Sequence, residues 1–170
     1  MIPRIVGITG FKRSGKDTLA GILRERAGFV RVAFADALKE EVRAFLGISG
    51  YDLERDKERW RPVLQYHGCA MREKDSDYWI NRIAYKIAWL VPARVVITDV
   101  RFRNEAAWIR KHGGEIVRVV RDGAIDAEPS WHVSEREVAE IEASHVIDAR
   151  TVEELSTKVG ILLEEWGRDG

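Results

Sequence analysis

Residues that could bind phosphate groups gather in one short segment near the start of the chain, Gly10-Phe11-Lys12-Arg13-Ser14-Gly15-Lys16-Asp17-Thr18. The segment has the spacing G-x-x-x-x-G-K and lies between a run of apolar residues and an amphipathic stretch typical of a helix. Glycines at both ends let successive backbone N–H groups face an anion, and the start of a helix adds partial positive charge. Lys16 supplies a mobile ammonium group. The pattern predicts a site for the phosphates of a nucleotide.

Two acidic residues are candidates for a magnesium site. Asp17 stands where Ser or Thr normally helps to hold Mg²⁺ in such loops, and a carboxylate can bind the metal in its place. The alternative is that Asp17 only favours the start of the helix through the helix dipole. Asp99 follows an apolar run, where a carboxylate can orient a magnesium-bound water or an acceptor hydroxyl. The alternative for Asp99 is a structural ion pair with Arg101.

Several arginines could hold an acceptor's phosphate and the charge that develops during its reaction. Phosphoryl transfer needs in-line positioning and positive charge, and a phosphate oxygen needs no activated nucleophile. Arg61, Arg72 and Arg101 match that demand, because arginine binds phosphate in bidentate geometry. Arg118 and Arg121 either reach the ATP phosphates when a lid closes or are merely solvated.

The elements that must position these residues alternate along the chain. Apolar, β-branched runs predict strands at 5–9, 30–34, 95–98, 116–120 and 145–147, with helical patterns between most of them. This order predicts a three-layer α/β domain with a parallel sheet of about five strands. Two segments break the alternation, 36–79 and 121–135. Because both follow strand ends, we expect an acceptor-binding insertion and a lid.

Composition limits the class of protein. The 170 residues suit a single domain, and no stretch is long and apolar enough to cross a bilayer. Lys plus Arg and Asp plus Glu are both 28, so a nucleic-acid partner is not expected. The start of the chain lacks signal-peptide features and Cys69 is the one cysteine, which predicts a reducing, cytoplasmic location. Whether the chain forms a homodimer is left open.

The chain resembles the deoxynucleoside monophosphate kinases of bacteriophages, which are relatives of the dephospho-coenzyme A and adenylate kinases. The most specific motifs are GFKRSGKDT at 10–18 and DVRFxNE at 99–105. The likeness covers most of the chain in order. Its remaining positions are Phe34-Ala35-Asp36, Leu38-Lys39, Arg61, Leu64-Gln65, Gly68, Arg72, Asp77, Trp79, His132 and Ser134-Glu135.

The resemblance implies a P-loop kinase that uses ATP and Mg²⁺, and it assigns three groups of residues. Ser14, Lys16, Asp17 and Thr18, within the loop that also contains Gly10, Lys12, Arg13 and Gly15, would bind the ATP phosphates and the metal. Arg61, Gln65, Gly68 and Trp79, with Asp36, Lys39 and Cys69 nearby, would form the acceptor site. Asp99, Arg101 and Glu105, with Arg72, would lie at the reaction centre. Pro62 and Cys69 depart from the family pattern, and Trp79 either stacks on a base or packs in the core.

We therefore expect a kinase that transfers the γ-phosphoryl group of ATP to a deoxynucleoside monophosphate. Two alternatives remain. One is a kinase of the same fold that acts on dephospho-coenzyme A or a phosphorylated small metabolite, and a panel of acceptors separates it from the first. The other is a switch that binds a nucleotide and signals to a protein partner without transfer. The acceptor-like segment 61–79 argues against the switch.

Overall fold

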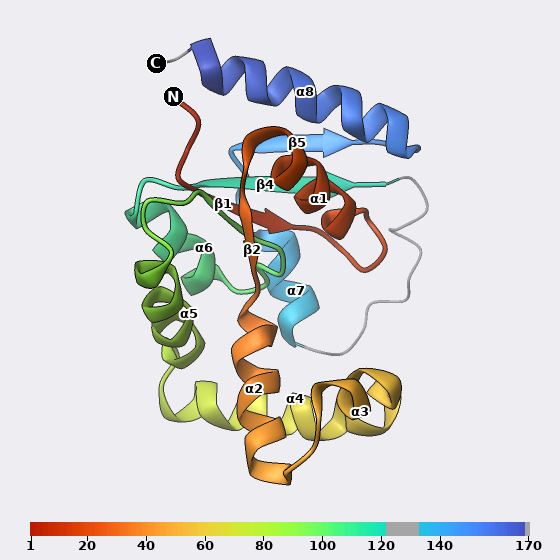
Figure 1. The fold of residues 1–170 in the computed structure, drawn as a ribbon, viewed down its shortest axis with the longest axis vertical. Helices are drawn as coiled ribbons and strands as arrows, with labels where there is room; N and C mark the ends of the chain where they lie inside the picture. The colour runs from red at the N-terminus through yellow and green to blue at the C-terminus, as the bar shows by residue number, and fades with distance from the viewer. Residues whose placement is uncertain (122–132, 169–170) are drawn as a thin grey trace.

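In a computed structural model, which describes residues 1–121 and 133–168, five parallel strands form one sheet (Figure 1). The strand order is β2-β3-β1-β4-β5. The strands are β1 (Ile5–Thr9), β2 (Val30–Val32), β3 (Val95–Ile97), β4 (Glu115–Val120) and β5 (His145–Asp148). The predicted parallel sheet of five strands is confirmed.

Helices cover both faces of the sheet. Alternate side chains of β1 divide between two apolar cores, because successive residues of a strand point to opposite faces. Val6 and Ile8 pack with α1 (Lys16–Ala27) and α8 (Val152–Arg168), while Ile5 packs on the other face. That second face is covered by α5 (Tyr78–Trp89), α6 (Arg103–Lys111) and α7 (Val133–Glu140) (Figure 1). The predicted three-layer arrangement is thus confirmed.

The segment after β2 leaves the sheet earlier than the sequence predicts. The strand was expected through residue 34, but Phe34 is the first residue of α2 (Phe34–Leu46). The carboxylate of Asp99 accepts hydrogen bonds from the first two N–H groups of this helix, those of Phe34 and Ala35. Since those groups have no partner inside a helix, Asp99 stabilises the helical start.

The predicted insertion consists of helices beyond the carboxyl ends of β2 and β3. After α2 come α3 (Gly50–Arg55) and α4 (Lys57–Lys74), and α5 leads back to the sheet (Figure 1). Proline is normally tolerated only in the first turn of a helix, yet Pro62 lies inside α4, at its sixth residue. Pro62 is exposed, so water can bind the carbonyl group of Glu58 that lacks its helical donor.

In the described ranges, no helix has the length and apolar character to cross a membrane. The predicted lid at 121–135 lies largely outside the described residues.

Candidate active site

The loop between β1 and α1 has the backbone that a phosphate cradle needs. Gly10 has a φ of 142° and Gly15 a φ of 104°, both in the region that favours glycine. A Cβ atom at Gly10 would lie 2.5 Å from the carbonyl oxygen of Val119, so only glycine fits there. Gly15 immediately precedes α1, which directs the free N–H groups of the helix start toward the loop.

Two side chains complete the loop. The ammonium group of Lys16 donates hydrogen bonds to the carbonyl oxygens of Gly10 and Phe11, at 2.8 and 2.5 Å, so it lies across the loop. The hydroxyl group of Ser14 is buried beside Gly10 and has no hydrogen-bond partner within the described part of the chain. An unpaired donor, a lysine and a helix start fit the oxygens of a nucleotide's phosphates.

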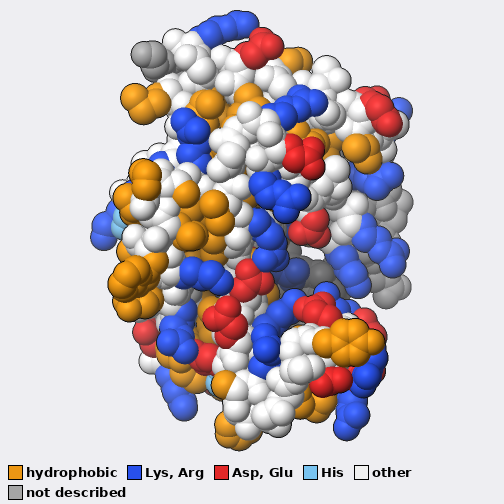
Figure 2. All heavy atoms as spheres, in the orientation of Figure 1, with side chains coloured by type: hydrophobic (Ala, Val, Ile, Leu, Met, Phe, Trp, Pro, Cys, Tyr) orange, Lys and Arg blue, Asp and Glu red, His pale blue; other side chains and the backbone are white. Residues whose placement is uncertain are grey.

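A cavity of about 360 Å³ lies next to this loop, between the strand ends and helices α2 and α4. Figure 2 shows Lys and Arg side chains gathered around a hollow between the sheet and the helices below it. The cavity is lined by thirteen predicted residues: Lys16, Asp17, Asp36, Lys39, Arg61, Gln65, Gly68, Cys69, Arg72, Trp79, Asp99, Arg101 and Glu105. The other predicted ATP-binding residues lie outside its lining: Gly10, Lys12, Arg13, Ser14, Gly15, Thr18 and Arg121.

One helix presents a stripe of residues to the cavity. Arg61, Gln65, Gly68 and Arg72 follow one another on α4 at intervals of three or four residues, so they share one face. Arg61 also pairs with Glu58 at 2.6 Å on the exposed surface. The stripe places two arginines along one wall of the cavity.

Helix α2 contributes charged residues to the neighbouring wall. Asp36 pairs with Arg31 at 2.7 Å, and Lys39 pairs with Glu54 of α3. Arg31 lines the cavity too, although no local sequence pattern marks it as a site residue.

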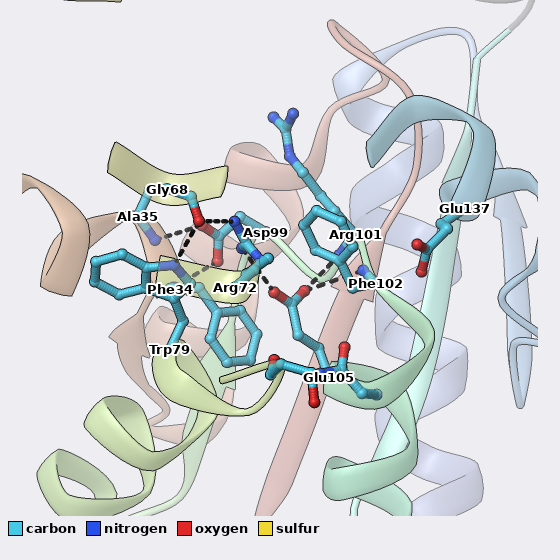
Figure 3. Close-up of polar contacts among 12 residues, drawn as sticks. Phe34, Ala35, Gly68, Arg72, Trp79, Asp99, Arg101, Phe102, Glu105 and Glu137 are labelled. Carbon is cyan, nitrogen blue, oxygen red and sulfur yellow. Dashed lines mark hydrogen bonds and ion pairs between the residues drawn. The ribbon is translucent and has the colours of Figure 1, made fainter. Parts of the chain in front are cut away.

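Asp99 has a structural contact that neither interpretation of the sequence included. Its two oxygens accept one backbone N–H each, from Phe34 at 2.8 Å and from Ala35 at 2.9 Å (Figure 3). Burial raises the pKa of Asp99, while these bonds and the charge of Arg101 act in the opposite direction. Asp99 therefore joins the end of β3 to the start of α2. Each oxygen keeps a lone pair for a further partner.

Glu105 is buried at the floor of the cavity and is held by three donors (Figure 3). Its Oε2 accepts the backbone N–H groups of Arg101 and Phe102, at 2.9 and 3.1 Å, and its Oε1 lies 3.2 Å from Nη2 of Arg72. Burial raises the pKa of Glu105 to about 7. Helix α6 begins at Arg103, and the side-chain amide of Asn104 donates hydrogen bonds to the carbonyl oxygen of Ser76 and to the carboxylate of Asp77.

Trp79 packs in the core and also borders the cavity. Only 2% of the residue is exposed, and its Nε1 donates to the carbonyl oxygen of Gly68 at 3.2 Å. Its ring contacts Tyr78 and His67 edge to face. These contacts fit the core-packing interpretation better than a free ring that stacks on a base.

Two residues make packing contacts that the sequence did not reveal, because their partners are distant in the sequence. Glu41 accepts hydrogen bonds from Tyr78 at 2.8 Å and Arg82 at 2.7 Å, and it lies 3.1 Å from His67. Glu41 thereby ties α2 to α4 and α5. Arg118 was expected either to reach ATP or to be solvated, but it donates to the carbonyl oxygens of Val138 and Ile141. Arg118 thus anchors the segment around α7.

The two predicted magnesium ligands line the same cavity. Among the residues described, no group of three or more His, Cys, Asp or Glu side chains could hold a metal. Nucleotide sites commonly bind Mg²⁺ through one or two carboxylates and the substrate's phosphates. Asp17, exposed at the start of α1, and Asp99 fit that requirement.

A phosphate-binding loop after β1, this strand order and a cavity lined by charged side chains at the strand ends define a P-loop kinase. Solved structures share the fold. Dephospho-CoA kinase from Campylobacter jejuni has a TM-score of 0.55 at 10% identity, over 96% of this chain and 97% of that one. Shikimate kinase from Aquifex aeolicus has a TM-score of 0.52 at 17% identity, over 98% and 99%.

Sequence comparison identifies the family. The chain is 31% identical to a protein of Acanthamoeba polyphaga mimivirus that is named for deoxynucleotide monophosphate kinase activity, over 91% of this chain and 93% of that protein. The chain therefore belongs to the deoxynucleotide monophosphate kinase family, as its motifs suggest. No protein-family model matches it.

Proposed function

We propose that the chain transfers the γ-phosphoryl group of MgATP to a deoxynucleoside monophosphate, giving the diphosphate and ADP. The observation that carries this proposal is the cavity itself. Lys16 and Asp17 line it on the side of the phosphate loop, and Arg61 and Arg72 line it from α4. Groups suited to two different phosphates therefore line one cavity.

On the ATP side, the loop backbone and Lys16 bind the β- and γ-phosphates. The hydroxyl group of Ser14, which has no partner among the described residues, donates a hydrogen bond to a phosphate oxygen. Asp17, with Asp99 acting through water, would hold Mg²⁺ against these oxygens. The metal supplies positive charge that offsets the charge of the transferring group.

On the acceptor side, Arg61, Arg72 and Arg101 bind the monophosphate, and Gln65 offers an amide to the rest of the nucleotide. An oxygen of the acceptor phosphate attacks the γ-phosphorus while the bond to the bridging oxygen of ADP breaks. Because that acceptor oxygen is ionised near neutral pH, no side chain has to remove a proton. The residues act by orientation and charge, and Cys69 and the histidines take no part in proton transfer.

Exchange of one arginine tests the acceptor site. Arg61→Ala should lower kcat/KM for the monophosphate about 30- to 150-fold. This corresponds to a loss of about 2 to 3 kcal/mol of transition-state stabilisation, because a charged phosphate contact is removed. Slow ATP hydrolysis without acceptor should change less than twofold. Arg59→Ala is the matched control, because Arg59 lies on the same helix but outside the cavity lining. Equal losses for ATP and acceptor, or none, would contradict the assignment of Arg61.

A further inference from the structure

Protein groups use most of the hydrogen-bonding capacity of the Glu105 carboxylate. Its side chain is 3% exposed, and both of its oxygens have donors: Arg72 on one, and the backbone of Arg101 and Phe102 on the other. A buried carboxylate with three donors has little capacity left for a ligand. Although Glu105 borders the cavity, its carboxylate oxygens accept hydrogen bonds from neighbouring protein groups.

Arg72 is the neighbour that reaches the cavity. Its guanidinium group lies over the ring of Phe102, 4.0 Å from the centroid, and its Nη1 donates to the carbonyl oxygen of Gly68 at 3.3 Å. The Nη2 of Arg72 donates a hydrogen bond to Oε1 of Glu105 (Figure 3). The plane of the guanidinium group is therefore fixed by a ring, a carbonyl and a carboxylate. An arginine fixed in this way loses little side-chain freedom when it binds a phosphate.

We propose that Glu105 is a positioning residue whose carboxylate fixes Arg72 in the acceptor cavity, so that acceptor binding depends on Glu105 although Glu105 does not touch the acceptor. This inference rests on the proposed function. The same carboxylate holds the backbone at Arg101 and Phe102, so it also fixes the ring on which Arg72 stacks.

If Glu105 fixes Arg72, kcat/KM for the acceptor should depend on the ionisation of Glu105 and therefore on pH. Burial raises the pKa of Glu105 to about 7; the charge of Asp99 adds to this effect and that of Arg72 opposes it. From α7, Glu137 faces the same turn and accepts the N–H group of Arg103. Below pH 7 Glu105 becomes neutral and holds Arg72 less firmly, because a neutral acceptor makes a weaker hydrogen bond with a guanidinium group. kcat/KM for the acceptor should thus rise as the pH passes through about 7.

The kinetic test compares Glu105→Gln and Glu105→Asp with the wild-type protein, using deoxythymidine and deoxyguanosine monophosphates as acceptors. Glu105→Gln should raise the KM for the acceptor about tenfold or more, with kcat/KM for ATP within about twofold. Glu105→Gln should also abolish the rise of kcat/KM for the acceptor near pH 7. The rise of kcat/KM near pH 6, which comes from ionisation of the acceptor's own phosphate, should remain. Glu105→Asp, which keeps the charge, should retain a rise with pH.

A second measurement needs no substrate and keeps the proposal testable if Glu105→Gln does not fold. The titration of the Glu105 carboxyl carbon is followed by NMR in wild-type protein and in Arg72→Met. Loss of Arg72 should raise the pKa of Glu105, since the arginine lowers it.

An unchanged titration in Arg72→Met, or losses shared equally by ATP and acceptor in a folded Glu105 variant, would overturn the proposal. If the wild-type protein phosphorylates no deoxynucleoside monophosphate while Arg72 still shifts the titration, the proposed function fails and the hold of Glu105 on Arg72 is supported.

Discussion

Replacing Asp99 by Asn tests how the end of β3 positions α2. The carboxylate binds two helix-start amides, those of Phe34 and Ala35, with one oxygen each. Asparagine has a single oxygen, so one amide would face the donor NH₂ group. An unsatisfied buried donor costs about 1 to 3 kcal/mol, and the lost negative charge at a helix start adds about 0.3 to 1 kcal/mol.

Part of that cost is offset. Burial raises the pKa of Asp99, which shows that the charged form is costly to bury, and the neutral amide avoids that cost. We therefore expect the free energy of unfolding to fall by about 2 kcal/mol, which lowers the melting temperature by about 4 to 8 °C for a domain of this size.

The assay is thermal unfolding at neutral pH without nucleotide. Asp36→Asn is the matched control, because it removes one carboxylate from the first turn of the same helix. Asp36 makes a surface ion pair with Arg31, so its loss should cost less than about 1 kcal/mol. A melting temperature of Asp99→Asn within about 2 °C of wild type, or equal effects of the two variants, would refute the capping role.

Three further predictions concern the phosphate loop and the buried glutamate. Lys16→Met should lower kcat by about a hundredfold or more, because one lost transition-state charge contact costs about 3 to 4 kcal/mol, and near-normal turnover in a folded variant would contradict the loop assignment. Asp17→Asn should raise the Mg²⁺ concentration for half-maximal rate more than it alters metal-free ATP binding, and an unchanged Mg²⁺ dependence would leave only the helix-dipole role. For Glu105, burial raises the pKa from 4.5 to about 7, so the folded state binds the proton more tightly than the unfolded state. The free energy of unfolding should then fall by about 3 kcal/mol between pH 4.5 and 7, and urea unfolding of Glu105→Gln should lack this fall.

The sheet and the phosphate loop could be predicted because their signals are local. A buried parallel strand is a continuous apolar run, and the loop needs glycines at fixed spacing, as the positive φ angles of Gly10 and Gly15 show. The shared face of Arg61 and Gln65 also follows from helical spacing alone.

The contacts that fix the site could not be predicted in this way. Asp99 and Phe34 are 65 positions apart, and Glu105 and Arg72 are 33 apart. Their partners are chosen by how helices pack on the sheet, and no local pattern records that choice. At Pro62 a local signal is misleading. Proline normally breaks a helix, but on an exposed face of α4 the helix continues through it.

The identity of the phosphorylated product is the most direct test of the proposed transfer to a deoxynucleoside monophosphate. The protein is incubated with MgATP and each deoxynucleoside and ribonucleoside monophosphate, with dephospho-coenzyme A as a non-nucleotide acceptor, and the products are separated and quantified. We predict that at least one deoxynucleoside diphosphate forms in equal amount to ADP and that Lys16→Met forms at least about a hundredfold less. Product from dephospho-coenzyme A alone, or tight nucleotide binding with no phosphorylated acceptor, would contradict this prediction.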